Sequence, residues 1–306
     1  MSRPHSGSTI LDIILGNSGA IESVGQLVSG MGRSDPIDCS CGAKVADCPF
    51  WTAVRDAFPL ANRWSWDEAG RLCREHSDLR NLAETLTAST DPAHTPQRYR
   101  DLDAIAEGIE AAIAKASGKP HLLDSSKEPT RGLMLLRFHP DARIIHLVRD
   151  PRRAVVSHYW RFKERGGYFE FRRKQYFRPG LAFPFMALAA VSWSVGNLLG
   201  ELARRIAPAR VIRVRYEDLC AEPARELRRI GEAFAIPVED VVAKVARKEP
   251  LAIGHDIGGN EIRFGREIVF NPGKGKEHTP PAWLQRLTVA LCWPMMLRYG
   301  YPLKES

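Results

Sequence analysis

The stretch ARIIHLVRDPRRAVVSHY, residues 142–159, decides the fold. Its first half is a short run of mostly aliphatic residues, which is the composition of a buried parallel strand. Asp150 and Pro151 follow, and they predict an N-cap and the first turn of a helix. Arg149 therefore stands between a strand and a helix, where α/β folds bind anionic ligands. Taken alone, the stretch also fits an ordinary strand–helix unit with a solvated arginine.

The whole chain has the composition of a globular protein. It has 306 residues, of which 44% are hydrophobic and 26% charged, and this length suits one large α/β domain or two small ones. The net charge of +8 favours an anionic ligand, an acidic surface or nucleic acid as a partner. Six cysteines argue against a disulfide scaffold in a chain of this length, and no signal peptide is recognisable. We therefore expect a protein of the reducing cytoplasm.

Further strand–helix units flank the opening stretch. Residues 121–124 and 209–215 read as strands, and helices are expected over 130–138 and 227–234. Such alternation predicts a central parallel sheet with helices on both faces, a three-layer α/β fold. Residues 62–117 are mostly helical and charged, which predicts a helical subdomain inserted at about 50–118 into a single domain, 1–306.

Two further segments bear on the surroundings of the protein. Residues 180–200 carry no charge, a length close to that of a membrane span, but their Pro, Ser and Asn residues favour a buried helix. Residues 161–178 are basic and rich in aromatic residues, which leaves peripheral membrane contact open.

Residues 255–276 read as a long surface loop of the kind that folds over a ligand. A last helix is expected around residues 283–299.

The amino-terminal segment offers a second anion site. Ser6, Gly7, Ser8 and Thr9 precede an apolar helical pattern that begins near Ser8 or Thr9. Hydroxyls, backbone N–H groups and the positive end of the helix dipole can together bind an anion. The Gly-Lys-Ser/Thr of a Walker A loop is missing, which disfavours a kinase-like NTPase.

Three cysteines lie within ten residues. Cys39, Cys41 and Cys48 could bind zinc, but no fourth ligand stands at a standard spacing. Reduced packing cysteines or a local disulfide are favoured over a metal, and we predict that no metal is required.

Together these motifs resemble the sulfotransferases that use 3′-phosphoadenosine 5′-phosphosulfate (PAPS), in particular a bacterial branch with a CxCG…CPFW segment. The resemblance covers nearly the whole chain and rests on the order RPHSGST, DSSKxP, HLVRDPRxxVxS, RYEDL and GNxxR. It implies a P-loop-like fold in which the first strand is truncated here, because only two residues precede Arg3.

The resemblance also implies a set of binding residues. Ser6–Thr9 would surround the 5′-phosphosulfate, and Arg149 with Ser157 would hold the 3′-phosphate. Tyr216 would contact the adenine. Asn260 and Arg263 would belong to a late loop that completes the nucleotide site. The residues themselves agree with this assignment, since arginine offers a planar set of donors and serine a short hydroxyl.

The catalytic residues are less well defined. Transfer of a sulfuryl group requires a cation at the leaving phosphate oxygen, and Lys127, just past a strand end, is the first candidate. His5 replaces the usual Lys or Arg of the family loop and is expected to act as a second cation or as the base. Asp124 is a further candidate base, although an Asp at a strand end more often fixes the next turn. Glu22 and His158 are weaker candidates.

The sequence thus predicts a PAPS-dependent sulfotransferase that acts on a hydroxyl or amine. The acceptor would be a small molecule, a glycan or a lipid-linked compound, handled in the cytoplasm or at a membrane surface. The alternative is a PAP- or PAPS-binding protein with impaired catalysis, because Gln26 stands where the related branch commonly has a Glu after Gly25. Nucleic-acid binding is disfavoured, since the cations lie in separate loops.

Overall fold

The protein is known here from a computed structural model that describes residues 1–33, 37–58, 63–164, 168–171, 174–177, 182–272 and 280–304. Its strands are short, and in chain order they are β1 (Ile21–Ser23), β2 (His121–Leu123), β3 (Ile144–Val148), β4 (Tyr168–Phe171), β5 (Lys174–Phe177), β6 (Val211–Arg215), β7 (Pro250–Ala252) and β8 (Glu267–Val269).

Most of the described chain is helical. The α-helices are α1 (Ser8–Gly16), α2 (Leu27–Gly30), α3 (Pro49–Ala57), α4 (Trp66–His76), α5 (Leu82–Thr87), α6 (Gln97–Ser117), α7 (Pro129–Phe138), α8 (Pro151–Glu164), α9 (Ala182–Ile206), α10 (Tyr216–Ala221), α11 (Pro223–Phe234), α12 (Glu239–Ala246) and α13 (Ala282–Arg298). Short 3-10 turns are η1 (Leu79–Asn81), η3 (Pro208–Arg210) and η4 (Glu261–Phe264).

The opening stretch folds as the sequence predicts. Residues of β3 are mostly buried, and β3 pairs in parallel with β6. Asp150 caps the following helix, since its Oδ1 accepts a hydrogen bond from the N–H of Arg152 at 2.8 Å. The helix α8 packs against α9 and α13, where its Val155 shares a core with Trp193 and Met296. Its apolar face therefore meets two helices.

The predicted central sheet is split among the described residues. β1 pairs in parallel with β2, and β3 pairs separately with β6. The chain start adds a single parallel bridge, Ser2 to Leu147, in place of a full first strand. A cavity of about 570 Å³ lies between the two pairs, and residues of both β2 and β3 line it. Two parallel pairs of strands thus stand in place of one continuous central sheet.

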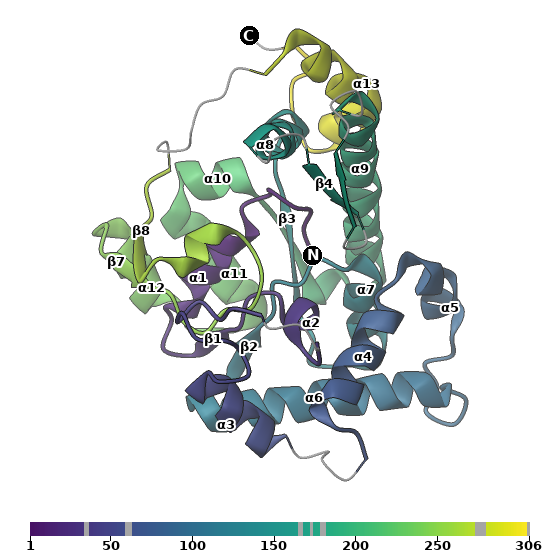
Figure 1. Ribbon diagram of the computed structural model, residues 1–306, viewed down its shortest axis with the longest axis vertical. Helices are drawn as coiled ribbons and strands as arrows, with labels where there is room; N and C mark the ends of the chain where they lie inside the picture. The colour runs from purple at the N-terminus through teal and green to yellow at the C-terminus, as the bar shows by residue number, and fades with distance from the viewer. Residues whose placement is uncertain are drawn as a thin grey trace.

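Helices fill the chain between β1 and β2. Figure 1 shows α3 and α6 at the bottom of the view and α5 at the right, while α8 and α13 lie toward the top and α9 runs down the right side. The helices α3 and α6 contribute Trp51, Tyr99 and Ile105 to one core, and this core also holds Ile257 of the late segment. The helical insertion is therefore joined to a segment more than one hundred residues later in the chain.

The uncharged segment forms α9. Among the described residues, only this helix is long and apolar enough to cross a membrane, by length and composition alone. It packs against α13, α8, α7 and β6, and Gly196 and Gly200 leave room on it for Arg3 and His146. About a third of its most apolar part is buried. Several apolar side chains on it and on α13 stay exposed, namely Phe183, Leu188, Val191, Val195, Leu198, Trp293 and Leu297.

A buried histidine joins the helical insertion to the rest of the fold. His139 follows α7, and its Nδ1 lies 2.7 Å from Asp103 Oδ1 and its Nε2 3.2 Å from Glu110 Oε1, both on α6. Only 4% of its side chain is exposed. The contact with Glu110, and then that with Asp103, raise the pKa of His139 to about 9 against the effect of burial.

This contact predicts a pH-dependent stability. Because the folded state holds the imidazolium, its contribution is full below the unfolded pKa of about 6.5 and is lost as the pH rises through about 9. We expect His139→Gln to lower the free energy of unfolding by about 2 kcal/mol at pH 6 and by much less above pH 9. Urea denaturation at both pH values measures this difference.

A matched control is His94→Gln, which removes an exposed histidine that contacts Asp91 at 2.7 Å. Its effect should stay below about 1 kcal/mol at either pH, because exposed ion pairs contribute little. An equal loss of stability in the His139 variant at pH 6 and above pH 9 would show that the imidazolium is not what holds α6 to α7.

Candidate functional site

The amino-terminal loop forms a tight turn in front of α1. His5 and Gly7 have positive φ angles of 64° and 89°, and the Ser6 hydroxyl donates to the carbonyl of Arg3 at 2.6 Å. A Cβ at Gly7 would lie 2.2 Å from Cδ2 of Tyr216, so that only glycine fits. The helix α1 begins at Ser8 without a side-chain cap. Its first N–H groups have no partner within the helix and can receive an anion.

Arg149 and Ser157 meet at the same residue of this loop. Arg149 leaves the carboxyl end of β3, and its Nη1 donates to the His5 carbonyl at 2.9 Å. Ser157, on α8, places its Oγ 2.9 Å from His5 Nδ1. Two residues eight apart in sequence thus converge on the glycine turn. Binding of a phosphate between them would replace the contacts to His5 with stronger, charge-assisted hydrogen bonds.

Tyr216 closes the same corner. It is the first residue of α10, directly after β6, and its ring lies against Gly7. The guanidinium carbon of Arg149 is 4.7 Å from the centre of this ring. Burial raises the pKa of the Tyr216 hydroxyl to about 12, so that the phenol stays protonated. The ring fixes the guanidinium and offers an aromatic face beside it.

The late loop reaches the first turn of α1. The N–H of Asn260 lies 3.4 Å from Thr9 Oγ1, and the Asn260 side chain caps η4 by accepting from the Ile262 N–H. Arg263 takes a different position. It is only 7% exposed, and its Nη1 donates to the carbonyls of Asp38 and Asp256, both at 2.9 Å. Arg263 therefore stabilises the loop from inside, and its contact with a nucleotide stays a prediction.

Lys127 faces the Gln26 amide. With the amide oxygen turned toward its two donors, Gln26 accepts from Lys127 Nζ at 2.9 Å and from the Gly259 N–H at 3.3 Å. Gly25 before it has φ 68°, and a Cβ there would lie 2.6 Å from the carbonyl oxygen of Ile257. Burial lowers the pKa of the Lys127 ammonium. A neutral amide thus stands where a carboxylate would pair with this lysine and cancel its charge.

The histidines of the site are neutral. Burial, and then the charges of neighbouring cationic groups, lower the pKa of His5 to about 3 and that of His158 to about 4. The two rings meet edge to face, with centroids 4.2 Å apart. His5 is therefore a neutral hydrogen-bonding group. The nearby cations that lower its pKa are Arg161, Lys127 and Arg149, and Arg3 lowers that of His158. A strongly positive cleft of this kind attracts a multiply charged anion.

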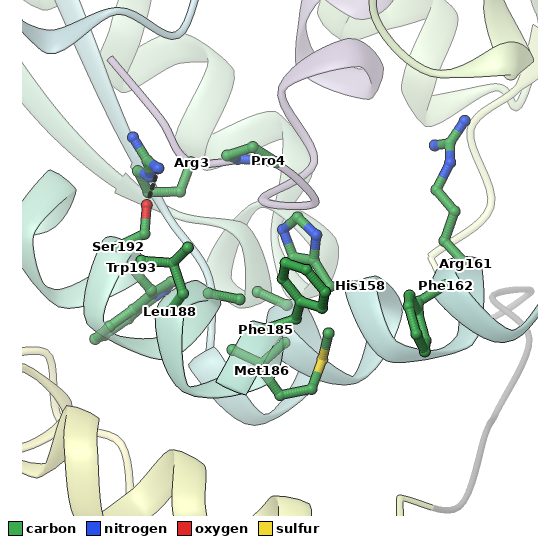
Figure 2. A pocket seen from close by; sticks show the side chains of 13 residues that line it. Arg3, Pro4, His158, Arg161, Phe162, Phe185, Met186, Leu188, Ser192 and Trp193 are labelled. Atoms are coloured by element: carbon green, nitrogen blue, oxygen red, sulfur yellow. Dashed lines mark hydrogen bonds between the residues drawn. The ribbon is translucent and has the colours of Figure 1, made fainter. Parts of the chain in front are cut away.

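An apolar pocket adjoins these cations. It has a volume of about 360 Å³ and lies between the amino-terminal segment, α8 and α9. Figure 2 shows His158 projecting from α8 toward the segment that holds Arg3 and Pro4. The Arg3 guanidinium donates to the Ser192 hydroxyl across the pocket. The other lining residues are mostly aromatic or aliphatic, and include Phe162, Phe185, Met186, Leu188, Ala189 and Trp193.

The other carboxylates proposed from sequence are bound to neighbours. Asp124 accepts from the N–H groups of Leu27 and Ser126 at 3.3 and 2.8 Å and pairs with Arg131. Glu22 pairs with Lys119 at 3.0 Å. Asp124 therefore fixes the turn after β2, as strand-end aspartates commonly do.

The basic stretch 161–178 is described only in part. Arg161 pairs with Glu261 of the late loop at 3.0 Å. The strands β4 and β5 pair with each other in antiparallel fashion, and residues 165–167, 172–173 and 178 lie outside the described part of the chain.

The cysteines acquire a partner that the sequence spacing does not reveal. Among the described residues, one cluster could hold a metal ion, and it joins Cys39, Cys41 and Cys48 to His255. All six cysteines are free, so the local disulfide considered from sequence is not formed. The fourth ligand lies 207 positions after Cys48 and was therefore invisible to local spacing rules.

Three residues of the site were underrated or missed from sequence. Arg3 and Trp193 line the pocket, and the indole N–H of Trp193 donates to the Arg149 carbonyl at 3.0 Å. From the sequence His158 is a weaker candidate, although it lines the pocket. The one available signal for His158 was its place directly after Ser157, on the first turns of the helix that follows the arginine strand.

Solved structures with a similar course of the chain are sulfotransferases. The sulfotransferase domain of the olefin synthase of Synechococcus PCC 7002 has 20% sequence identity and a TM-score of 0.50, over 99% of this chain and 94% of that one. Sulfotransferase STF9 of Mycobacterium avium has 16% identity and a TM-score of 0.49, over 99% of this chain and 76% of that one. The first likeness shows a common fold. No curated protein sequence matches this chain significantly.

Family membership rests on the sequence itself. The model of the sulfotransferase family matches residues 1–240, which include the amino-terminal loop, Lys127, Arg149 and Tyr216. This match covers well over half of the chain. The protein therefore belongs to the sulfotransferase family.

Proposed function

We propose that this protein transfers a sulfuryl group from PAPS to a hydroxyl or amine acceptor. In this reaction the bond between sulfur and the bridging 5′-phosphate oxygen breaks, and the acceptor oxygen or nitrogen forms a bond to sulfur. The acceptor loses its proton, and 3′-phosphoadenosine 5′-phosphate (PAP) is released. The observation that carries the proposal is the convergence of Arg149 and Ser157 on His5, at the entrance to the uncapped end of α1.

The donor would bind with its two anionic ends in separate cradles. Arg149 and Ser157 hold the 3′-phosphate, and Ser6–Thr9 with the first N–H groups of α1 hold the 5′-phosphosulfate. The exposed part of Tyr216 contacts the adenine. Asn260 closes over the nucleotide through its contact with Thr9. Arg263 contributes to nucleotide binding indirectly, because it stabilises the loop that holds Asn260.

Catalysis would depend on charge and position. Lys127 stabilises the negative charge that develops on the leaving phosphate oxygen, and its hydrogen-bond partner, the Gln26 amide, carries no charge of its own. His158 faces the acceptor pocket as a neutral imidazole, the form that accepts a proton. His5 lies against it and orients its ring. This assignment makes His158 the base, and it gives His5 a positioning role in addition to its contact with the phosphate site.

The apolar pocket favours an acceptor with an apolar body. Its wall continues into the exposed apolar face of α9, because Leu188 lines the pocket and is also 53% exposed. A lipid-linked or aromatic acceptor could enter from this side. We infer a cytoplasmic enzyme that contacts a membrane peripherally through α9 and α13 while it takes up such an acceptor.

The test of the donor site uses PAP binding measured by isothermal titration calorimetry. Arg149→Ala should weaken PAP binding by about 10²-fold or more, the cost of losing charge-assisted hydrogen bonds to a phosphate. The control is Arg143→Ala, an exposed arginine just before β3, which should change the affinity by less than about twofold. Equal PAP affinity of the Arg149 variant and the native chain would remove the donor assignment.

The test of the catalytic residues uses a labelled donor in an acceptor screen. His158→Gln should lower kcat by about 10²-fold or more while the KM for PAPS changes little. Lys127→Met should lower kcat by about 10²–10³-fold. Gln26→Glu should lower activity too, because the new carboxylate would pair with Lys127. Activity found only in the Gln26→Glu variant would instead support the alternative, a nucleotide-binding protein with impaired catalysis.

The acceptor class is tested with two acceptors that share the same sugar hydroxyls and differ in their alkyl group, dodecyl-β-glucoside and methyl-β-glucoside. The dodecyl compound should react with a kcat/KM at least about tenfold higher, since burial of several methylenes contributes about 0.8 kcal/mol each. Leu188→Asp should abolish this preference and leave PAP affinity unchanged. Leu198→Asp, on the same helix and 59% exposed, should keep the preference and weaken cosedimentation with phosphatidylglycerol vesicles. Equal rates for both glucosides would contradict an apolar acceptor site.

A further inference from the structure

Four metal-binding side chains gather away from the cations of the donor site. They are Cys39, Cys41 and Cys48, which lie before or at the start of α3, and His255 of the late segment. Their ligand atoms all lie within 4.8 Å of one another. Two of the cysteines are buried and Cys41 is exposed, so that the cluster is held by the core and open to solvent on one side. None of these side chains has a role in the proposed sulfuryl transfer.

The distances match a tetrahedral zinc site. Zinc–sulfur and zinc–nitrogen bonds of about 2.3 and 2.0–2.1 Å place two sulfur ligands about 3.8 Å apart, and sulfur and nitrogen ligands about 3.5 Å apart. The Sγ atoms of Cys41 and Cys48 are 3.7 Å apart. His255 Nδ1 lies 3.7 Å from Cys39 Sγ and 3.3 Å from Cys48 Sγ. The sulfurs are too far apart for a disulfide, whose bond length is about 2.05 Å.

The surrounding residues hold the histidine in the orientation that the site requires. The indole N–H of Trp51 donates to the His255 carbonyl at 2.9 Å, and the ring of Phe50 stacks on the imidazole with centroids 4.9 Å apart. Both aromatic residues come within three positions after Cys48, in the sequence CPFW. The segment that supplies the last cysteine thus also fixes the histidine, which is the usual task of residues around metal ligands.

Backbone and hydroxyl contacts join the two halves of the cluster. The Ser40 hydroxyl donates to the Gly254 carbonyl at 2.6 Å, and Ser40 Oγ accepts from the N–H of Asp256 at 2.7 Å. Cys39 forms an antiparallel bridge with Ile257. Gly42, between Cys41 and the next turn, has φ 92°, a conformation that folds the short cysteine segment back on itself. Contacts of neighbouring residues therefore hold the four ligand side chains close together.

We propose that Cys39, Cys41, Cys48 and His255 bind one zinc ion in a structural Cys3His site. The donor set selects the metal, because three thiolates and one imidazole in tetrahedral array are typical of structural zinc and leave no open position for chemistry. In the reducing cytoplasm such a cluster binds metal in preference to forming disulfides. This proposal replaces the sequence-based expectation that the cysteines only pack.

The ion fastens the late segment to the cysteine segment and the core below it. Directly after His255 and Asp256, Ile257 exchanges backbone hydrogen bonds with Val24 and Gln26. The next residues, Gly259 and Asn260, touch the Gln26 amide and Thr9. Zinc therefore anchors one end of the loop that reaches α1, and its removal should loosen residues 37–48 and 254–260 together.

The test begins with the metal content of the native full-length chain. The protein is produced in zinc-supplemented medium and dialysed against a metal-free buffer. Inductively coupled plasma mass spectrometry should then find one zinc ion per chain. Cys41→Ser, which changes the exposed ligand, should weaken zinc binding about 10²-fold or more. Cys292→Ser is the matched control, since Cys292 is a buried thiol that donates to the Ala190 carbonyl and should leave one zinc bound.

Three further measurements keep the result decisive if a serine variant misfolds. His255→Cys supplies a fourth thiolate and should retain one zinc, whereas His255→Phe should lose it. Cobalt(II) added to the metal-free native chain should give the intense visible bands of tetrahedral thiolate coordination. Hydrogen exchange after chelation should rise in residues 37–48 and 254–260. A native chain that carries no zinc and gives no such cobalt bands would overturn the proposal, whatever its sulfotransferase activity.

Discussion

The hydrogen bond from Arg149 to the His5 carbonyl is the contact on which the site depends. It joins the carboxyl end of β3 to a turn that two positive φ angles force back toward α1. Tyr216 covers the same turn and lies under the guanidinium, so that three segments meet at one corner. Behind this corner α1, β3 and α10 share one core, to which they contribute Leu11, Leu147 and Leu219. The three segments are thus brought together without a ligand, and preorganisation of this kind lowers the cost of binding.

The same corner concentrates positive charge at a cost in free energy. Four cations surround two histidines that stay neutral because burial and the cations depress their pKa values. The Gln26 amide that accepts from Lys127 adds no negative charge beside it. Sites that hold like charges together are commonly sites for a ligand of opposite charge. The arrangement agrees with the proposed donor, which carries negative charge at both ends.

Local sequence patterns predicted most elements near the site. The strand at Ile144–Val148, the cap at Asp150 and the start of α1 at Ser8 follow from composition and capping rules. Residues 255–276 were read as a surface loop, yet Asp256, Ile257 and Arg263 are buried. The polar and glycine residues of this run have the composition of a surface loop. Which of them are buried depends on contacts with residues distant in sequence, such as Asp38 and Val24. A local sequence pattern does not reveal such contacts.

Long-range contacts account for what the sequence could not predict. His255 joins the cysteines across more than two hundred residues, and a spacing rule sees only neighbours. The strands form two pairs, the segment before α1 adds one bridge to β3, and a cavity lies beside β2. The helix α8 shares one core with Val148 of β3 and with residues of α9 and α13.

The most direct test of the account is a crystal structure of the protein with PAP bound. The account predicts 3′-phosphate oxygens within hydrogen-bond distance of the Arg149 guanidinium and the Ser157 hydroxyl, in place of their contacts to His5. The 5′-phosphate should lie on the first N–H groups of α1, near Lys127. A nucleotide bound elsewhere, with Arg149 still donating to the His5 carbonyl, would contradict it.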